Sequence, residues 1–115
     1  RAMVPGEPEF GVSEHVATVL LAAREAGADV RGAVNLRYDP ETVETLAADH
    51  PTVEFDAERP TREAVADAVA GADLPADEEG ETFVVYQTGA VGVEPIVYVL
   101  APTAVEAART VRRLL

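Results

Sequence analysis

Apolar and polar residues recur along this chain at two different spacings. Apolar positions three and four residues apart mark one face of an amphipathic helix, as at Val16, Val19, Leu20 and Ala23. This spacing predicts four helices, which lie between Ser13 and Gly27, between Asp39 and Pro51, between Thr61 and Ala72, and from Thr103 to the last turn near Arg113. Strand-like runs predict four strands, over Val30–Tyr38, Thr52–Asp56, Thr82–Gln87 and Ile96–Leu100. The expected order is α-β-α-β-α-β-β-α.

The ends of the expected helices carry residues that stabilise helix termini. N-cap positions are assigned to Ser13, Asp39, Thr61 and Thr103. Thr103 also forms a capping box with Glu106. Gly27 suits the position after a helix, and Pro51 ends the second helix because it pushes His50 towards extended geometry.

The strands differ in the pattern of their two faces. In Val30–Tyr38, alternation places Val30, Val34, Leu36 and Tyr38 on one face and Arg31, Ala33, Asn35 and Arg37 on the other. Thr82–Gln87 is apolar on both faces, which predicts a central strand. A short loop without a helix joins it to Ile96–Leu100, so these two strands should be antiparallel. The sequence therefore predicts an α/β fold, a layered domain whose mixed β-sheet is flanked by helices.

Length and composition predict one globular domain over residues 1–115, with 48% hydrophobic residues. Because the chain starts at Arg1 and not at Met, we expect a fragment of a longer protein. The longest apolar stretch, Val16–Ala23, is far shorter than the roughly 20 residues that a membrane span needs. The chain has no cysteine, which excludes disulfides, thiolate catalysis and cysteine-based zinc sites. The acidic stretch Asp73–Glu81 is expected to be an exposed connection.

The net charge of −12 changes the picture of possible partners. All nine basic residues are Arg, against 21 Asp and Glu. Such a surface repels phosphate backbones, so direct nucleic-acid binding by this segment is not expected. An acidic, lysine-free chain rich in Ala and Val suits a salt-filled cytosol, where ions screen its self-repulsion. We interpret it as a cytoplasmic protein of a halophilic archaeon; the alternative is an acidic protein from a GC-rich mesophile.

The first segment that could carry chemistry precedes and opens the first helix. Glu9, Phe10 and Gly11 lead into Ser13 and His15. Gly11 allows close approach to a ligand, and the unpaired N–H groups of a helix start bind anions. The simpler interpretation is an ordinary helix start with a solvated histidine.

The second segment is Asn35 with Arg37. Side chains two apart on a strand point the same way, and a guanidinium matches phosphate or carboxylate. Asn35 is the one asparagine of the chain. The alternative is a solvated outer face.

The third segment is the loop that follows the expected central strand. Gly89 and Gly92 form a Gly-x-x-Gly pattern whose amides can wrap a phosphate, with Val91 between them. Glu94 at the loop's exit could face a cation or an amino group. Most such loops only turn the chain. His15 and His50 form no metal-binding motif, so no metal site is predicted.

Together, and in this order, the three segments resemble the archaeal thiamine-phosphate synthase (ThiN-type) domain family. The resemblance rests on Pro8-Glu9-Phe10-Gly11-x-Ser13-x-His15, on Asn35-Leu36-Arg37-Tyr38 and on Tyr86-x-x-Gly89-x-Val91-Gly92-x-Glu94-Pro95. It implies an α/β fold and a ligand site at Glu9, Phe10, Gly11, Ser13, His15, Asn35, Arg37, Gly89, Val91, Gly92 and Glu94. Family enzymes join a pyrimidine diphosphate to a thiazole phosphate and release pyrophosphate. Other members, fused to helix-turn-helix domains, resemble thiamine-phosphate-sensing repressors.

The departures from the enzyme pattern favour the sensor branch. The enzymes carry Asp, Arg, Asp and Lys where this chain has Gln87, Thr88, Ala90 and Val93. Pyrophosphate departure needs positive charge or a metal, so no catalytic residue is assigned here.

The sequence is therefore expected to be a catalytically degenerate thiamine-phosphate sensor domain of an archaeal transcriptional regulator. Its ligand would be thiamine phosphate or a related pathway compound. It would act as a homodimer without a cofactor, and reach DNA only through a separate fused domain. One alternative is an active thiamine-phosphate synthase domain, which would need Mg²⁺. A structural or dimerisation module without a ligand is the third possibility.

Overall fold

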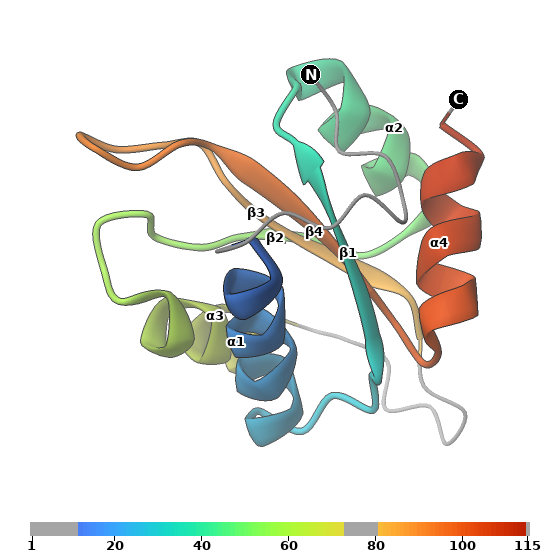
Figure 1. Ribbon diagram of the computed structural model, residues 1–115, viewed down its shortest axis with the longest axis horizontal. Coiled ribbons are helices and arrows are strands. Elements are labelled where there is room, and N and C mark those ends of the chain that lie inside the picture. Colours follow the sequence, from blue (N-terminus) through green and yellow to red (C-terminus); the bar gives the residue numbers. More distant parts are fainter. Residues whose placement is uncertain (1–11, 73–80, 115) are drawn as a thin grey trace.

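Four strands form one mixed sheet between two pairs of helices (Figure 1). The computed structural model describes residues 12–72 and 81–114, so the acidic connection predicted at 73–81 lies almost wholly outside the described residues. The helices are α1 (Val12–Glu25), α2 (Pro40–Asp49), α3 (Thr61–Gly71) and α4 (Ala104–Arg112). The strands are β1 (Gly32–Arg37), β2 (Thr52–Glu54), β3 (Phe83–Gln87) and β4 (Ile96–Ala101). The predicted order and α/β class are confirmed.

The sheet has the strand order β1-β4-β3-β2, so β3 is central as predicted. β3 and β4 form an antiparallel hairpin, β1 pairs with β4 antiparallel, and β2 pairs with β3 parallel. The β2–α3–β3 unit is thus a parallel crossover on a sheet that is otherwise antiparallel, which confirms the predicted mixed sheet.

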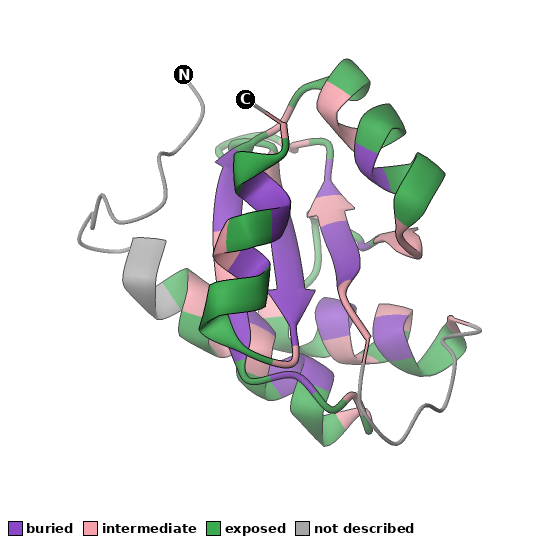
Figure 2. Cartoon of the chain, turned by 90° about the vertical axis from the view of Figure 1, so that its right-hand side faces the viewer, coloured by how far each residue is buried: buried purple, intermediate pink, exposed green. Residues whose placement is uncertain are grey.

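Each face of the sheet has its own apolar core. On one face α1 and α3 cover Phe83, Val85, Tyr98 and Leu100. On the other face, Leu46 of α2 and Val111 of α4 pack with Val84, Val97 and Val99. Figure 2 shows buried residues along the strands and on the helix sides that face them. This two-faced burial explains why β3 and β4 read as continuous apolar runs.

Helix ends follow the predicted capping chemistry at three places. Asp39 accepts a hydrogen bond from the Glu41 amide at 2.8 Å, and Thr103 accepts one from the Glu106 amide at 3.1 Å. After α1, Gly27 takes φ 103° while the Ala28 amide bonds to the Ala23 carbonyl at 3.0 Å. That last pattern is a Schellman C-cap, which needs a left-handed residue.

Three sequence predictions need correction. Thr61 is not the N-cap of α3: Pro60 holds that place without a side-chain bond, and Thr61 is already helical. Ser13 lies inside α1, which starts at Val12. Val30 packs in the α1/α3 core and not with Leu36, because it precedes the β1 ladder and strand alternation does not apply there.

No helix within residues 12–72 and 81–114 is both long enough and apolar enough to cross a membrane.

Candidate functional site

A cavity of about 590 Å³ opens on the α1/α3 side of the sheet, at the end where α1 begins. Its walls come from three segments: the start of α1 with His15, the β2–α3 loop with Phe55 and Arg59, and the β3–β4 hairpin. This volume falls in the range of small-molecule sites, roughly 300–1,000 Å³.

The β3–β4 loop is held by the side chain of Gln87, which is 4% exposed. Its Nε2 donates to the Glu94 carbonyl at 2.6 Å, and its Oε1 accepts from the Gly89 amide at 2.6 Å. One amide therefore joins the beginning of the loop to its end. Because both ends of this amide bond to the loop backbone, Gln87 supports the cavity wall.

The outer part of the loop is a small hairpin of its own. Ala90 and Val93 exchange two backbone hydrogen bonds, at 3.1 and 3.0 Å. Gly89 at φ 95° and Gly92 at φ 77° occupy left-handed conformations that favour glycine. At the tip, the Val91 side chain is fully exposed.

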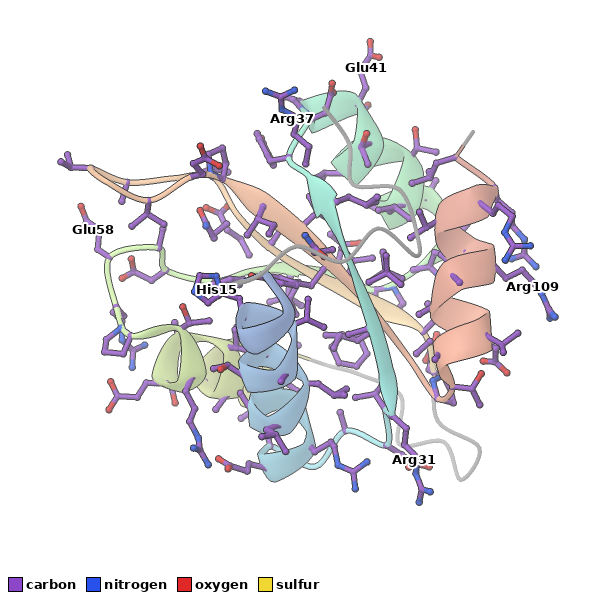
Figure 3. All side chains as sticks on the ribbon, in the orientation of Figure 1. His15, Arg31, Arg37, Glu41, Glu58 and Arg109 are labelled. Carbon is purple, nitrogen blue, oxygen red and sulfur yellow. The ribbon has the colours of Figure 1, made fainter. Side chains whose placement is uncertain are left out.

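Charged groups of the cavity lie at its rim. His15 and Glu94 are exposed, and Figure 3 shows His15 at the start of α1. Arg59 is also exposed, and its guanidinium bonds to the Asp67 carboxylate at 2.7 Å. The rim can therefore hold a charged ligand group while keeping it in contact with water.

The floor is aromatic and almost closed to solvent. Tyr98 is 2% exposed, and its ring centroid lies 6.4 Å from that of Phe55 at a tilt of 34°. Burial raises the pKa of the Tyr98 hydroxyl to about 12, so this group stays protonated and uncharged near neutral pH. The floor thus offers apolar ring surface and one neutral hydroxyl.

The structure brings together part of the predicted site. His15, Gly92 and Glu94 line the cavity. Gly89 lines a neighbouring hollow of about 420 Å³, whose other wall is the β2–α3 loop with Asp56. Val91 points away at the hairpin tip. Glu9, Phe10 and Gly11 lie outside the described residues, as does the side chain of Ser13.

Asn35 and Arg37 lie on the same sheet face as the cavity but differ in exposure. Asn35 is directly opposite Tyr98 in the β1–β4 ladder and is 8% exposed, so it does not belong to a solvated outer face. Arg37 is opposite Ile96 at the end of β1, and its side chain is exposed (Figure 3). Within the described residues, Arg37 is not part of the cavity wall.

Sequence reasoning did not assign most of the cavity wall to the site, including Phe55, Arg59, Gln87 and Tyr98. The sequence did contain a hint for Tyr98. It stands two positions after Ile96 on an expected strand, so the side chains of Ile96 and Tyr98 point to the same face of the sheet, and both line the cavity. Arg59 gave no signal, because its place depends on how the β2–α3 loop folds back over the sheet.

No group of three His, Asp or Glu side chains in the described part of the chain gathers closely enough to hold a metal ion.

Two archaeal proteins are similar in sequence to this chain. The bifunctional thiamine biosynthesis protein ThiDN of Methanocaldococcus jannaschii is 29% identical over 110 residues, which are 94% of this chain and 26% of that protein. The thiamine-phosphate synthase ThiN of Methanothermobacter thermautotrophicus is 27% identical over 122 residues, which cover 100% of this chain and 64% of that protein. The chain therefore spans less than two thirds of either relative.

Solved structures show the same kind of domain. The C-terminal domain of protein MJ0236 superposes with a TM-score of 0.70 at 26% identity, over 92% of this chain and 59% of that one. The C-terminal domain of a phosphomethylpyrimidine kinase gives a TM-score of 0.67 at 21% identity, over 100% of this chain and 72% of that one, and shows the shared fold.

The family described as "Thiamine-phosphate synthase ThiN" matches residues 1–113. This match covers nearly the whole chain and includes the three segments whose described parts lie at or beside the cavity. The chain therefore belongs to the thiamine-phosphate synthase ThiN family.

Proposed function

We propose that this domain binds thiamine phosphate, or a closely related pathway compound, in the cavity, and that it acts as the sensor domain of an archaeal transcriptional regulator. Family membership and the relatives' names support a thiamine-pathway ligand. The ligand's phosphate would lie at the rim near His15, Glu94 would face its cationic or amino-bearing part, and its uncharged ring would enter towards the floor.

The state of the Gln87 amide carries the sensor proposal. Both of its polar ends are bonded within the loop, at 2.6 Å each, and its neutral amide offers neither a negative charge for a metal nor a titratable group for proton transfer. Thr88, Ala90 and Val93 add no charge to the same loop. Departure of pyrophosphate develops negative charge that must be met by cations or a metal. The loop is therefore suited to holding a ligand and not to converting it.

A second candidate is an active thiamine-phosphate synthase domain. Both curated relatives carry thiamine-biosynthesis names, and one is a thiamine-phosphate synthase, which favours it. Under this alternative, residues outside the described cavity wall would bind Mg²⁺ and supply cationic groups in addition to Arg59. The sensor needs neither of these.

One assay separates the two candidates. Purified protein in molar KCl is mixed with the pyrimidine diphosphate, the thiazole phosphate and Mg²⁺, and thiamine phosphate is measured over many turnovers. Calorimetric titration of the same protein with thiamine phosphate runs in parallel. The sensor is expected to bind without turnover, whereas sustained synthesis would support the enzyme. A flat titration with no synthesis would favour a module without a ligand.

The sensor proposal also implies partners. The domain would act in the cytoplasm as a homodimer and pass its signal to a separate DNA-binding domain. The charge of −12 supports an arrangement in which this domain does not contact the nucleic acid and a separate domain binds it.

A further inference from the structure

Two polar side chains lie almost buried beside the cavity, and within residues 12–72 and 81–114 neither has a hydrogen-bond partner. Tyr98 is 2% exposed and Asn35 is 8% exposed, and they stand opposite each other in the β1–β4 ladder. Neither side chain makes a hydrogen bond to another residue in the part of the chain that the structure describes. Buried polar groups are normally paired, because an unpaired one costs about 1–3 kcal/mol.

The Tyr98 hydroxyl keeps a small opening towards the cavity. Every fully enclosed side-chain nitrogen or oxygen in the described residues has a partner, so an unpartnered hydroxyl must retain some exposed area. Tyr98 lines the cavity, and apart from Asn35 opposite it, its neighbours in the core, such as Phe55, Val85 and Leu100, are apolar. The opening therefore leads into the cavity floor.

These surroundings exclude a charged group at the floor. The ionisable side chains of the cavity wall, His15, Arg59 and Glu94, are all exposed at the rim. A phosphate or an ammonium next to Phe55 and Tyr98 would lose its hydration without gaining an opposite charge, which is strongly unfavourable. A flat, uncharged ring with nitrogen atoms on its edge fits better, because its faces can stack on aromatic side chains while its edge accepts or donates one hydrogen bond.

We propose that the Tyr98 hydroxyl is a specificity-determining group, which hydrogen-bonds the edge of an uncharged heteroaromatic ring of the ligand at the cavity floor, with Asn35 as a second polar group beside it. This assignment rests on the proposed function, since it describes how the same cavity recognises the ring of its ligand. It explains why the chain keeps a hydroxyl at a place where phenylalanine would serve packing equally well.

The test is the substitution Tyr98→Phe, with Tyr38→Phe as the matched control. Tyr38 loses the same atom, but it lies on the opposite face, stacked on Tyr86 at 6.1 Å. Calorimetric titration with thiamine phosphate in molar KCl should show about three- to tenfold weaker binding for Tyr98→Phe, as expected for one lost hydrogen bond. Tyr38→Phe should bind like the unmodified protein. The melting temperature of Tyr98→Phe should stay equal or rise, since the hydroxyl makes no hydrogen bond to another described residue.

A second probe locates the contact. Unphosphorylated thiamine should lose the same factor on Tyr98→Phe, because the hydroxyl faces the ring and not the phosphate. A loss seen only with thiamine phosphate would overturn the assignment to a ring. Equal binding by Tyr98→Phe and the unmodified protein would overturn it as well, while leaving the proposed function intact. Absence of binding by the unmodified protein would overturn the proposed function and this assignment together.

Discussion

Gln87 shows how one side chain can determine the shape of a loop. Its amide satisfies the Gly89 N–H and the Glu94 carbonyl at once, and it is buried while doing so. Sequence reasoning treated this position only as a lost carboxylate. Its structural role was not predictable, because the role depends on the loop returning to within reach of the same side chain.

Replacing Gln87 by Leu should lower the free energy of unfolding by about 1–3 kcal/mol. The substitution keeps the side chain's bulk but leaves the Gly89 amide and the Glu94 carbonyl without their partner. Chemical denaturation followed by circular dichroism measures the loss, and thiamine-phosphate binding should weaken with it. Thr88→Ala, at the exposed neighbouring position, is the control and should change stability little. Equal stability of both variants would show that the two hydrogen bonds of the Gln87 side chain do not stabilise the fold.

Arg37 leads to a second prediction at the residue scale. Its exposed guanidinium stands at the end of β1 on the cavity's face of the sheet, and we predict that it binds the phosphate of the ligand. Arg37→Ala should weaken thiamine-phosphate binding about ten- to a hundredfold, as expected for a charge-assisted hydrogen bond of roughly 1.5–3 kcal/mol. Titration calorimetry provides the measurement.

Arg31→Ala is the control for Arg37, because Arg31 is an exposed arginine just before the other end of β1 (Figure 3). It should bind normally. If thiamine and thiamine phosphate bind equally well to the unmodified protein, Arg37 does not contact a phosphate.

At the scale of elements, the sequence predicted what local chemistry controls and missed what tertiary packing controls. The caps at Asp39 and Thr103 and the stop at Gly27 were predicted, since each depends on a few neighbouring residues. The face of Val30 was predicted wrongly, because the first ladder residue of β1 is Gly32 and only pairing with β4 fixes that start. The burial of Asn35 was left open, because the sequence does not show which face of the sheet α1 covers.

The contact between β1 and α4 can be tested by adding a single carbon atom. A Cβ at Gly32 would collide with the backbone of Thr103 and Ala104, where α4 begins, so Gly32→Ala should destabilise the fold by about 1–3 kcal/mol or more. Gly71→Ala is the control: nothing lies within 4 Å of its added Cβ, and alanine favours the end of α3. Thermal unfolding should therefore show a clear drop for Gly32→Ala and no drop for Gly71→Ala.

The β3–β4 loop permits a test of lost catalysis at the same scale. Four changes restore the charges of the enzyme pattern: Gln87→Asp, Thr88→Arg, Ala90→Asp and Val93→Lys. The double variant with only the two Asp changes should remain inactive, because the leaving pyrophosphate would still lack cations. Thiamine-phosphate synthesis, assayed with both substrates and Mg²⁺, is expected only in the quadruple variant. Appreciable synthesis by the unmodified protein would contradict the sensor proposal.

At the scale of the whole molecule, the main feature is the large excess of negative charge. Twenty-one acidic residues face nine arginines on one small domain, and two of those arginines, Arg59 and Arg62, form exposed ion pairs with Asp67 and Glu25. Exposed pairs of this kind contribute little to stability. Most of the acidic charge must therefore be tolerated through screening by ions.

The melting temperature should rise steadily from dilute buffer to molar KCl, because salt screens the repulsion among carboxylates. Differential scanning calorimetry across the salt series measures the effect. A variant with Glu44→Gln and Asp49→Asn, both exposed on α2, should melt higher than the unmodified protein in dilute buffer and equally in molar salt. A flat or falling curve would remove the halophilic interpretation.

The strand order also constrains how the chain can fold during its synthesis. The two inner strands, β3 and β4, come last in the sequence, whereas β1 and β2, which are made first, form the outer edges and do not pair with each other. A nascent chain that has left the ribosome only as far as α3 therefore holds strands with no partner. Its sheet must wait for the final hairpin, and until then its apolar helix faces stay exposed, which makes this stage of synthesis prone to aggregation.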